Sequence, residues 1–174
     1  EYGTIINVAA YTDVDGAETP EGRKVAWAVN VTGVAQLARI ATQHRITLVH
    51  ISSDYVFDGT SDRPYREDDP VCPLSVYGQT KAAGDQIVAT VPRHYIVRTS
   101  WVIGDGPNFV RTMLELAEQG ANPSVVDDQF GRLTFASELT RAIRHLVDAC
   151  APYGIYNVSN AGAPMSWAEI AREV

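Results

Sequence analysis

Three short stretches of the chain are almost continuously apolar and rich in β-branched residues, a pattern typical of strands buried on both faces of a parallel sheet. They cover residues 4–10, 47–57 and 94–104. Apolar positions at helical spacing separate them, first over 20–45 and again over 73–88. Strands that alternate with helices in this way predict an α/β fold with a parallel sheet and right-handed crossovers.

The rest of the chain continues the alternation with shorter elements. We expect a helix over 108–120, ended by Gly120, and another over 137–150 with Ser137 as its N-cap. The other expected elements are a short strand and turn over 123–132, a strand over 154–160 and the start of a helix over 166–174. No internal repeat or low-complexity tract interrupts this order.

The composition is that of an ordinary globular protein. Of 174 residues, 45% are hydrophobic and 20% are charged, which suffices for one domain with a sizeable core. The formal net charge is −7 and the basic residues are scattered, which argues against a nucleic-acid surface. No signal peptide is visible, and no apolar run reaches the roughly 18 residues that a membrane span needs.

Cysteine and histidine positions show neither a disulfide framework nor a metal-binding pattern. Cys72 and Cys150 lie far apart, and the four histidines lack the spacing of metal ligands. We therefore expect no metal site. A reducing cytoplasm fits the cysteine usage best.

The residues that follow each predicted strand carry the candidate chemistry, because ligands of open parallel sheets bind beyond the carboxyl ends of the strands. Small residues at 9–12 follow the first strand and would let a flat ligand lie against the backbone. Hydroxyl groups and one carboxylate follow the second strand at 52–55, and Trp101 follows the third. We expect these segments to border one crevice.

Tyr77 and Lys81 lie four positions apart in the helix expected over 73–88, and the spacing permits two interpretations. An amphipathic helix often packs an aromatic ring over a lysine stem without any chemical role. Alternatively, the ammonium lowers the pKa of the phenol toward neutral pH and suits it to proton transfer. Convergence with Ser53 favours the second interpretation, because the three groups together could polarise a carbonyl and protonate it as hydride arrives.

At these residues the chain resembles the extended short-chain dehydrogenase/reductase superfamily and, within it, the dTDP-4-dehydrorhamnose reductases. Eight segments carry the resemblance in family order, over nearly the whole chain: INVAAYTDVDGAE (6–18), AVNVTG (28–33), HISSDYVFDGT (50–60), SVYGQTKAAGDQ (75–86), RTSWVIG (98–104), NFVRTMLELA (108–117), VVDDQFGR (125–132) and GIYNVSN (154–160). The resemblance implies a Rossmann-like doubly wound parallel sheet with the start of a small C-terminal substrate lobe. It also implies reduction of the C4 keto group of dTDP-4-dehydro-6-deoxy-L-mannose with NADPH or NADH.

The resemblance further implies roles for individual residues. Tyr77 would donate the proton, Lys81 would lower the pKa of that phenol and bind the nicotinamide ribose, and Ser53, where the family usually has threonine, would hold the keto oxygen. The implied cofactor contacts are Ala10, Tyr11, Thr12, Tyr77 and Lys81, and the implied substrate contacts are Ser53, Asp54, Tyr55, Trp101, Asn108 and Gln129. Tyr55 and Asn108 fit packing and capping equally well. Asn30 either organises the site or is an ordinary helix-surface residue.

One family feature has no counterpart in the sequence. The superfamily holds the cofactor pyrophosphate with a Gly-rich turn in its first βαβ unit, and GDGPN at 104–108 lacks the required spacing. We therefore expect residues 1–174 to form a single partial NAD(P)-binding domain without the family's N-terminal strands. On that expectation the isolated chain binds NAD(P)H very weakly, shows no reductase activity and associates through an exposed edge that carries Ile5, Ile6 and Val8.

Two other functions stay open from the sequence. An epimerase or reductase of another nucleotide-linked sugar would share the same Ser, Tyr and Lys set. A non-catalytic regulatory module of the same fold, as in the regulatory subunit of methionine adenosyltransferase, would not need these side chains, and their joint presence speaks against it. The expected partner is a dTDP-sugar, with a homodimer and a fused epimerase domain left open, and with no nucleic acid and no membrane.

Overall fold

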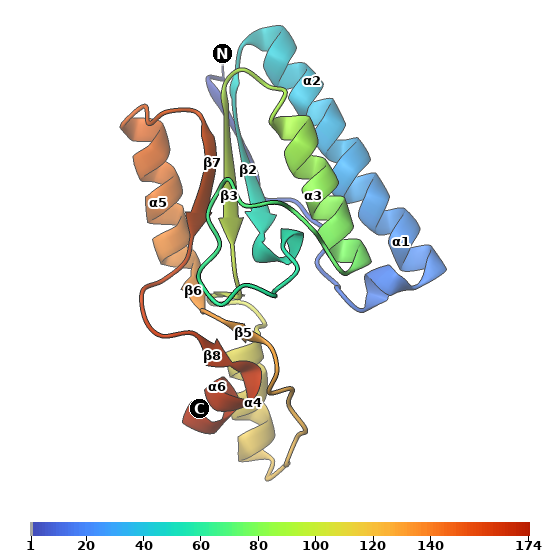
Figure 1. Ribbon diagram of the computed structural model, residues 1–174, viewed down its shortest axis with the longest axis vertical. Coiled ribbons are helices and arrows are strands. Elements are labelled where there is room, and N and C mark those ends of the chain that lie inside the picture. Colours follow the sequence, from blue (N-terminus) through green and yellow to red (C-terminus); the bar gives the residue numbers. More distant parts are fainter. Residues whose placement is uncertain (1) are drawn as a thin grey trace. The chain divides into compact units, whose positions relative to one another are not determined.

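The computed structural model describes residues 2–174, which gather into two compact units (Figure 1). The first unit holds the residues up to Arg98 together with Leu146–Asn157. The second holds Thr99–His145 together with Val158–Val174. Strands and helices alternate along the chain, so the fold is α/β, as the hydrophobic pattern predicts. In the described part of the chain, no helix has the length and apolar character needed to cross a membrane.

A four-stranded sheet in the order β1–β2–β3–β7 forms the centre of the first unit. Its strands are β1 (Thr4–Asn7), β2 (Thr47–Ser53), β3 (His94–Thr99) and β7 (Gly154–Val158). β1 and β2 run parallel, and their register sets Asn7 opposite His50. Because paired residues of neighbouring strands share a face, these two polar side chains lie side by side on the sheet.

One long helical run links β1 to β2. Its parts are a 3-10 turn η1 (Gly16–Glu18), α1 (Pro20–Trp27), a π-helical segment η2 (Ala28–Gly33) and α2 (Val34–His44). Thr19 caps α1 by accepting a hydrogen bond from the Gly22 N–H, and Pro20 occupies the first helical position. The run ends at Arg45, whose φ of 54° lies in the left-handed region. The single helix expected over 20–45 therefore contains a π-helical interruption.

Two clusters of buried apolar side chains hold the first unit together. α3 (Val76–Val88), which links β2 to β3, contributes to both. One cluster joins it to α2 and the strands and comprises Val34, Ala38, Ala41, Leu48, Val88, Val91 and Ile96. The other comprises Ala17, Ala26, Val76 and Tyr77, with Tyr11, Val14 and Tyr55 packed against it. Tyr77 is therefore part of the core as well as a candidate site residue.

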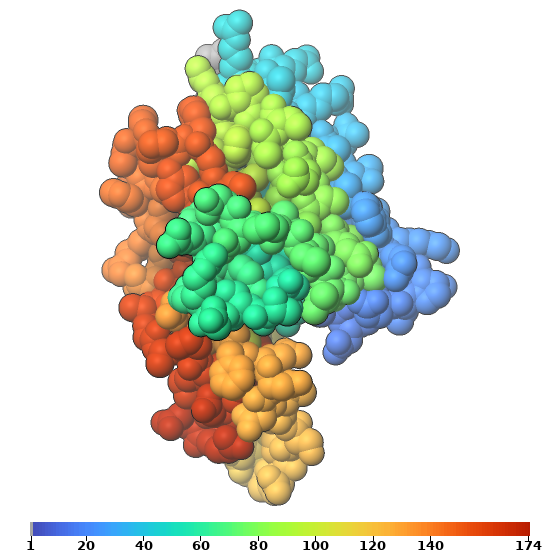
Figure 2. All heavy atoms as spheres, viewed as in Figure 1, coloured from blue at the N-terminus to red at the C-terminus, as the bar shows by residue number. Residues whose placement is uncertain are grey.

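The segment that precedes α3 is fastened to the sheet by polar contacts. It begins with a 3-10 turn, η3 (Asp54–Val56). Arg98 of β3 donates to the Glu67 carbonyl at 3.2 Å, and Asn157 of β7 donates from its backbone N–H to the Glu67 carboxylate at 2.9 Å. Tyr65 stacks on Phe57 with ring centroids 4.2 Å apart. In Figure 2 this segment, in green, occupies the viewed face of the first unit.

The second unit consists of short strand pairs and helices. β4 (Val102–Ile103) pairs in parallel with β6 (Thr134–Phe135), and β5 (Phe130–Gly131) pairs antiparallel with β8 (Met165–Ser166). The helices are α4 (Phe109–Glu118), α6 (Trp167–Glu173) and most of α5 (Ala136–Asp148). A capping box starts α6, because the Ser166 hydroxyl and the Glu169 carboxylate each accept the backbone N–H of the other residue.

All three N-terminal strands are shorter than the apolar runs that predict them. β1 stops at Asn7, whose side-chain oxygen accepts a hydrogen bond from the Ala9 N–H and turns the chain. β2 stops at Ser53, whose hydroxyl accepts from the Tyr55 N–H. The third run breaks at Trp101, where φ is 44°. Side-chain hydrogen bonds and one left-handed residue thus end strands that hydrophobicity alone would extend.

Two boundaries in the second half of the chain were predicted wrongly. α5 begins at Ala136, directly after β6, so Ser137 lies inside the first turn and is not the N-cap. Only Phe130–Gly131 of the segment 123–132 is a strand. The Val126 carbonyl instead accepts a hydrogen bond from a backbone N–H of α6.

β1 is an edge strand of the described sheet, and its apolar residues divide between its two faces. Ile6 and Val8 are 52% and 74% exposed, as expected for an uncovered edge. Ile5 instead packs against the first core cluster, because alternate residues of a strand point to opposite faces. The expectation that all three would be exposed is therefore wrong for Ile5.

Candidate active site

The N-terminus of α3, which presents the candidate side chains, is held by two caps. Ser75 accepts a hydrogen bond from the Gly78 N–H at 3.0 Å, and the Glu18 carboxylate accepts one from the Val76 N–H at 2.8 Å. Both caps satisfy donors that the first helical turn leaves unpaired. The carboxylate also suits the positive end of the helix dipole.

Tyr77 lies in the first turn of α3 and is 9% exposed. Its ring meets the ring of Tyr55 edge-on, with centroids 5.6 Å apart. Gly78 permits this approach, since a Cβ there would stand 2.3 Å from the Tyr55 carbonyl oxygen. The Ser53 hydroxyl at the end of β2 lies near enough to the Tyr77 phenol to lower its pKa. The fold thus joins the phenol and the hydroxyl that the sequence singled out.

The pKa of Tyr77 is raised, whereas the sequence led us to expect a lowered value. Burial is the largest cause, the Ser53 hydroxyl opposes it, and the negative charge of Asp54 adds to the rise. Lys81 does not reverse the effect, because the cost of desolvating a phenolate dominates and the ammonium is directed at a backbone carbonyl. A phenol that stays protonated is suited to donate a proton.

Lys81 follows one turn along α3 and is 2% exposed. Its Nζ donates to the Ile51 carbonyl of β2 at 2.7 Å. Burial lowers its pKa to about 8, against the opposing effect of the Asp85 carboxylate. The side chain is therefore mostly charged at neutral pH. An ammonium has three N–H donors, so two more can serve ligand hydroxyls such as those of a ribose.

Ser53 and Asp54 form a linked pair where β2 ends. Ser53 Oγ donates to Asp54 Oδ1 at 3.2 Å and accepts from the Tyr55 N–H at the same distance. Burial raises the pKa of Asp54 to about 6, while the hydrogen bond from Ser53 opposes the rise. A carboxyl group with this pKa, beside a phenol and a hydroxyl, is typical of a functional site.

Asn30 settles an alternative that the sequence left open. It is 1% exposed in the π-helical segment, so the helix-surface interpretation is wrong. Its Oδ1 accepts from the Tyr11 N–H at 2.9 Å, and its Nδ2 donates to the Tyr11 carbonyl at 3.1 Å and to Thr80 Oγ1 at 3.0 Å. The amide pairs with the Tyr11 backbone as a neighbouring strand would. It therefore fixes the turn that contains Ala10, Tyr11 and Thr12.

Three of the sequence-predicted residues belong to the second unit. Trp101 stacks on Trp167, with ring centroids 3.7 Å apart and 19° between the ring planes. Asn108 caps α4 by accepting a hydrogen bond from the Arg111 N–H, which is the capping role that the sequence allowed. Gln129 is exposed in the segment before β5.

Three buried ionisable residues of the described chain escaped the sequence pattern: His50, Asp85 and Arg98. Asp85 lies on the same helix face as Tyr77 and Lys81, four residues after Lys81, and this spacing could have identified it. His50 and Arg98 stand inside apolar strand runs, where nothing local distinguishes a buried polar side chain from an exposed one.

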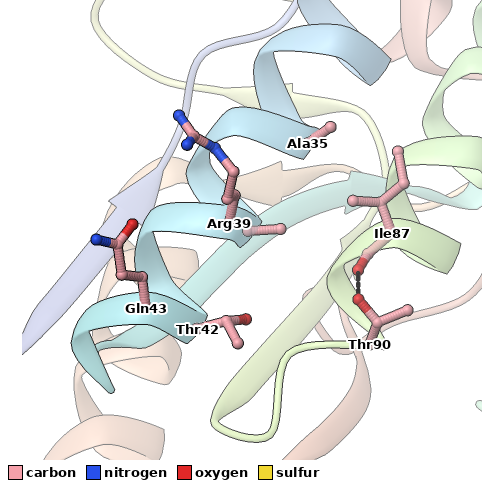
Figure 3. Close-up of a pocket in the computed structure, with 7 residues that line it drawn as sticks. Ala35, Arg39, Thr42, Gln43, Ile87 and Thr90 are labelled. Atoms are coloured by element: carbon pink, nitrogen blue, oxygen red, sulfur yellow. Dashed lines mark hydrogen bonds between the residues drawn. The ribbon is translucent and has the colours of Figure 1, made fainter.

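A hollow of about 410 Å³ lies apart from these residues, between α2 and α3 (Figure 3). Its lining consists of Ala35, Ala38, Arg39, Thr42, Gln43, Ile87 and Thr90. None of these was predicted as a site residue, and the hollow offers one charged group, so it is not the candidate site. Across residues 2–174, no three His, Cys, Asp or Glu side chains are grouped to hold a metal ion.

A parallel α/β sheet with a Ser hydroxyl at the end of one strand, beside the Tyr of a Tyr-x-x-x-Lys helix, places the chain in the Rossmann-like class of folds. Comparison with known families makes the assignment specific. The family described as the RmlD substrate binding domain matches residues 1–174, and the chain belongs to that family.

Individual relatives agree with this assignment. The chain is 42% identical over 175 residues to the dTDP-4-dehydrorhamnose reductase of Aggregatibacter actinomycetemcomitans, covering 96% of this chain and 58% of the relative. It is 41% identical over 172 residues to a dTDP-4-keto-6-deoxy-D-glucose reductase of Streptomyces niveus, covering 97% and 58%. Among solved structures, the dTDP-4-dehydrorhamnose reductase of Bacillus anthracis in complex with NADP superimposes with a TM-score of 0.91 at 39% identity, covering 98% and 60%. The chain thus spans about three fifths of the length of these relatives.

Proposed function

We propose that the protein containing this chain reduces the C4 keto group of dTDP-4-dehydro-6-deoxy-L-mannose to give dTDP-L-rhamnose, with NADPH as the hydride donor. The observation that carries the proposal is the placement of the Ser53 hydroxyl beside the buried Tyr77 phenol, with the buried Lys81 ammonium one helical turn away. The names of the relatives support the substrate, and the NADP complex of the Bacillus anthracis structure supports the cofactor. NADH is the alternative donor.

The side chains divide the work of this reaction. The cofactor supplies hydride to C4 of the keto sugar. The Ser53 hydroxyl donates a hydrogen bond to the C4 oxygen as negative charge develops on it, and Tyr77 transfers its phenolic proton to that oxygen. Burial keeps the phenol protonated until then, and the Lys81 ammonium stabilises the phenolate that remains.

The remaining contacts follow from the same proposal. Ala10, Tyr11 and Thr12, in the turn that Asn30 fixes, would hold the cofactor, and the Lys81 ammonium and Tyr77 would hold its ribose. On the substrate side the proposal places Ser53, Asp54, Tyr55, Trp101, Asn108 and Gln129. One N–H of the Lys81 ammonium donates to the Ile51 carbonyl. The other two support the ribose contact, because each can donate to one hydroxyl.

A second candidate is reduction of a different dTDP-4-keto-6-deoxy sugar. The Streptomyces niveus relative carries that activity in its name at nearly the same identity as the first relative. The Ser53, Tyr77 and Lys81 groups act only on the keto group and its oxygen. They would serve either sugar, so the choice depends on contacts to the rest of the ligand.

The assay uses the natural protein with NADPH and a panel of dTDP-, UDP- and GDP-linked 4-keto-6-deoxy sugars. We expect NADPH oxidation with the dTDP-linked L-mannose derivative and a product with the L-rhamno configuration by NMR. Faster turnover of the D-glucose derivative would favour the second candidate. Turnover of none of them would favour a regulatory module of the same fold.

Location and assembly belong to the same proposal. We place the protein in the cytoplasm, because Cys72 and Cys150 are free and exposed, as a reducing compartment allows. A homodimer and a fused epimerase domain are the proposed assemblies. Sedimentation of the natural protein tests the first, and its reading frame tests the second.

A further inference from the structure

A row of buried polar side chains crosses the sheet beside α3. One comes from each of three strands, Asn7 from β1, His50 from β2 and Arg98 from β3, and Asp85 comes from α3. Each of the four is at most 5% exposed. Burial of charged and polar groups is costly unless they are paired, so the contacts within the row decide what it does.

The contacts link the row from Asn7 at one end to Arg98 at the other. Asn7 Nδ2 lies 2.9 Å from His50 Nδ1, and since an amide N–H can only donate, the neutral imidazole carries its proton on Nε2. His50 Nε2 faces Asp85 Oδ1 at 4.0 Å. Arg98 Nε donates to the other carboxylate oxygen, Oδ2, at 3.0 Å. Arg98 of β3 thus orients Asp85, while Oδ1 faces His50 and has no hydrogen-bond partner within the described structure.

Lys81 lies one helical turn from Asp85 and depends on it electrostatically. Lys81 interacts electrostatically with Asp85 on α3 and with His50 on β2. Tyr77 lies one turn before it on the same helix, and Arg98 of β3 contacts Asp85. His50 contributes no compensating charge, because burial and the charge of Lys81 hold its pKa at about 3. The carboxylate of Asp85 is the group that opposes the lowering of the Lys81 pKa by burial.

We propose that Asp85 is a positioning residue for the Tyr77–Lys81 pair: Arg98 orients its carboxylate, and the carboxylate keeps the buried Lys81 ammonium charged at neutral pH. The consequence for catalysis rests on the proposed function. The effect on Lys81 itself does not, because it concerns a protonation equilibrium within one packed unit.

The titration of Lys81 tests the proposal directly. The chain contains only two lysines, Lys81 and the exposed Lys24, so isotopically labelled lysine gives two ε-carbon resonances, one of which is an internal control. We expect Asp85→Asn to lower the Lys81 midpoint by about one pH unit or more, the size typical of a lost neighbouring charge. Lys24 should not move.

A matched variant separates this effect from the loss of any ion pair. Asp69 is also an aspartate held by an arginine, Arg63, at 2.8 Å, but it lies in the loop before α3. Asp69→Asn should leave the Lys81 midpoint unchanged, and Asp85→Glu should restore most of it. If Asp85→Asn does not fold, Asp85→Ser is smaller, keeps a hydroxyl beside Arg98 and should show the same fall. An unchanged Lys81 midpoint in a folded Asp85 variant would overturn the proposal and leave Asp85 a purely structural role.

The catalytic consequence has its own readout in the natural protein. If Lys81 must be charged, the alkaline limb of the kcat profile should move to lower pH in Asp85→Asn by the same amount as the Lys81 midpoint. A fall in kcat that is equal at every pH would contradict this link. Absence of turnover in the unaltered protein would refute the proposed function but would leave the titration result standing.

Discussion

The properties of Tyr77 follow from its burial more than from its neighbours in the helix. Desolvation of the phenolate raises its pKa, and the Ser53 hydroxyl compensates only in part. The side chain is therefore protonated at the start of the proposed reaction. It gives up its proton as hydride reaches the carbonyl carbon and negative charge develops on the carbonyl oxygen. Tyr77 acts as a proton donor in the proposed reaction for this reason.

Replacing Tyr77 by phenylalanine should remove the proton donor and leave the packing. We expect kcat of the natural protein to fall by about 10²–10⁴-fold, the usual contribution of general acid catalysis. The free energy of unfolding should change by no more than about 1.5 kcal/mol, since only the hydroxyl is lost and the ring stays in its cluster. Steady-state kinetics and urea unfolding check both parts. Turnover within a few-fold of the unaltered protein would exclude Tyr77 as the acid.

His50 makes the fold sensitive to acid. Its pKa is about 3 in the folded protein and near 6.5 when unfolded, so between these values the unfolded state binds the extra proton. Stability supplied by the neutral imidazole is thus complete above about pH 6.5 and is lost as the pH falls. Asp54, with a pKa raised to about 6, works in the opposite direction over part of this range.

A comparison with His50→Gln isolates the contribution of His50 to the pH dependence of stability, because Asp54 is present in both proteins. From pH 7 to pH 4.5 the unaltered chain should lose about 2–3 kcal/mol of unfolding free energy relative to the variant. Urea unfolding at several pH values measures the difference. Parallel pH curves for the two proteins would show that His50 is protonated at its ordinary pKa.

At the scale of elements, α3 is held unusually close to its neighbours by two glycines. A Cβ at Gly78 would stand 2.3 Å from the Tyr55 carbonyl oxygen, and one at Gly84 would stand 2.7 Å from the Asn30 carbonyl oxygen. The helix is thereby seated against η3 at one end and against the π-helical segment further along. Both contacts involve backbone atoms, which cannot move aside as a flexible side chain can.

Gly78→Ala should therefore destabilise the chain although alanine favours helices. We expect a loss of about 1–3 kcal/mol from overpacking. Gly33 is the matched control, because it also has helical φ, is exposed, and would bring its Cβ only within 3.5 Å of another atom. Gly33→Ala should be neutral or stabilising by up to about 1 kcal/mol. Equal urea midpoints for both variants would show that the α3–η3 contact yields easily.

For the molecule as a whole, the residues proposed for the chemistry and some of those proposed to contact the substrate belong to different compact units. Ser53, Tyr77 and Lys81 all belong to the first unit, together with the turn that Asn30 fixes. Trp101 belongs to the second, where its stacking on Trp167 orients the ring. The proton-donating group and its supports can therefore form within one packed core.

The edge of the sheet predicts how a preparation of residues 1–174 behaves in solution. β1 lies at the edge of the described sheet, and Ile6 and Val8 are exposed beside its unpaired backbone, a recognised template for strand pairing. We expect concentration-dependent association, measurable by sedimentation velocity. Val8→Lys should reduce it, because a charged side chain at an edge disfavours pairing. A monomer at high concentration in the unaltered chain would contradict the prediction.

The order of strands and helices and the pairing of Tyr77 with Lys81 on one helix face could be predicted from the sequence. These are local properties, since hydrophobic periodicity and four-residue spacing need no knowledge of what packs above them. The ends of the strands were harder to predict from the sequence. β1 and β2 stop where the side chains of Asn7 and Ser53 bond to nearby backbone, an interaction that competes with the apolar pattern.

The protonation states and the supporting contacts depend on how the chain packs. Local spacing placed an ammonium near Tyr77 and predicted a lowered pKa, but burial, which depends on elements distant in the sequence, set the direction. The same holds for Asn30, whose buried amide meets Tyr11, and for Asp85, which Arg98 of β3 holds. Desolvation and cross-strand contact are properties of the packed molecule, because they arise between residues that only the fold brings together.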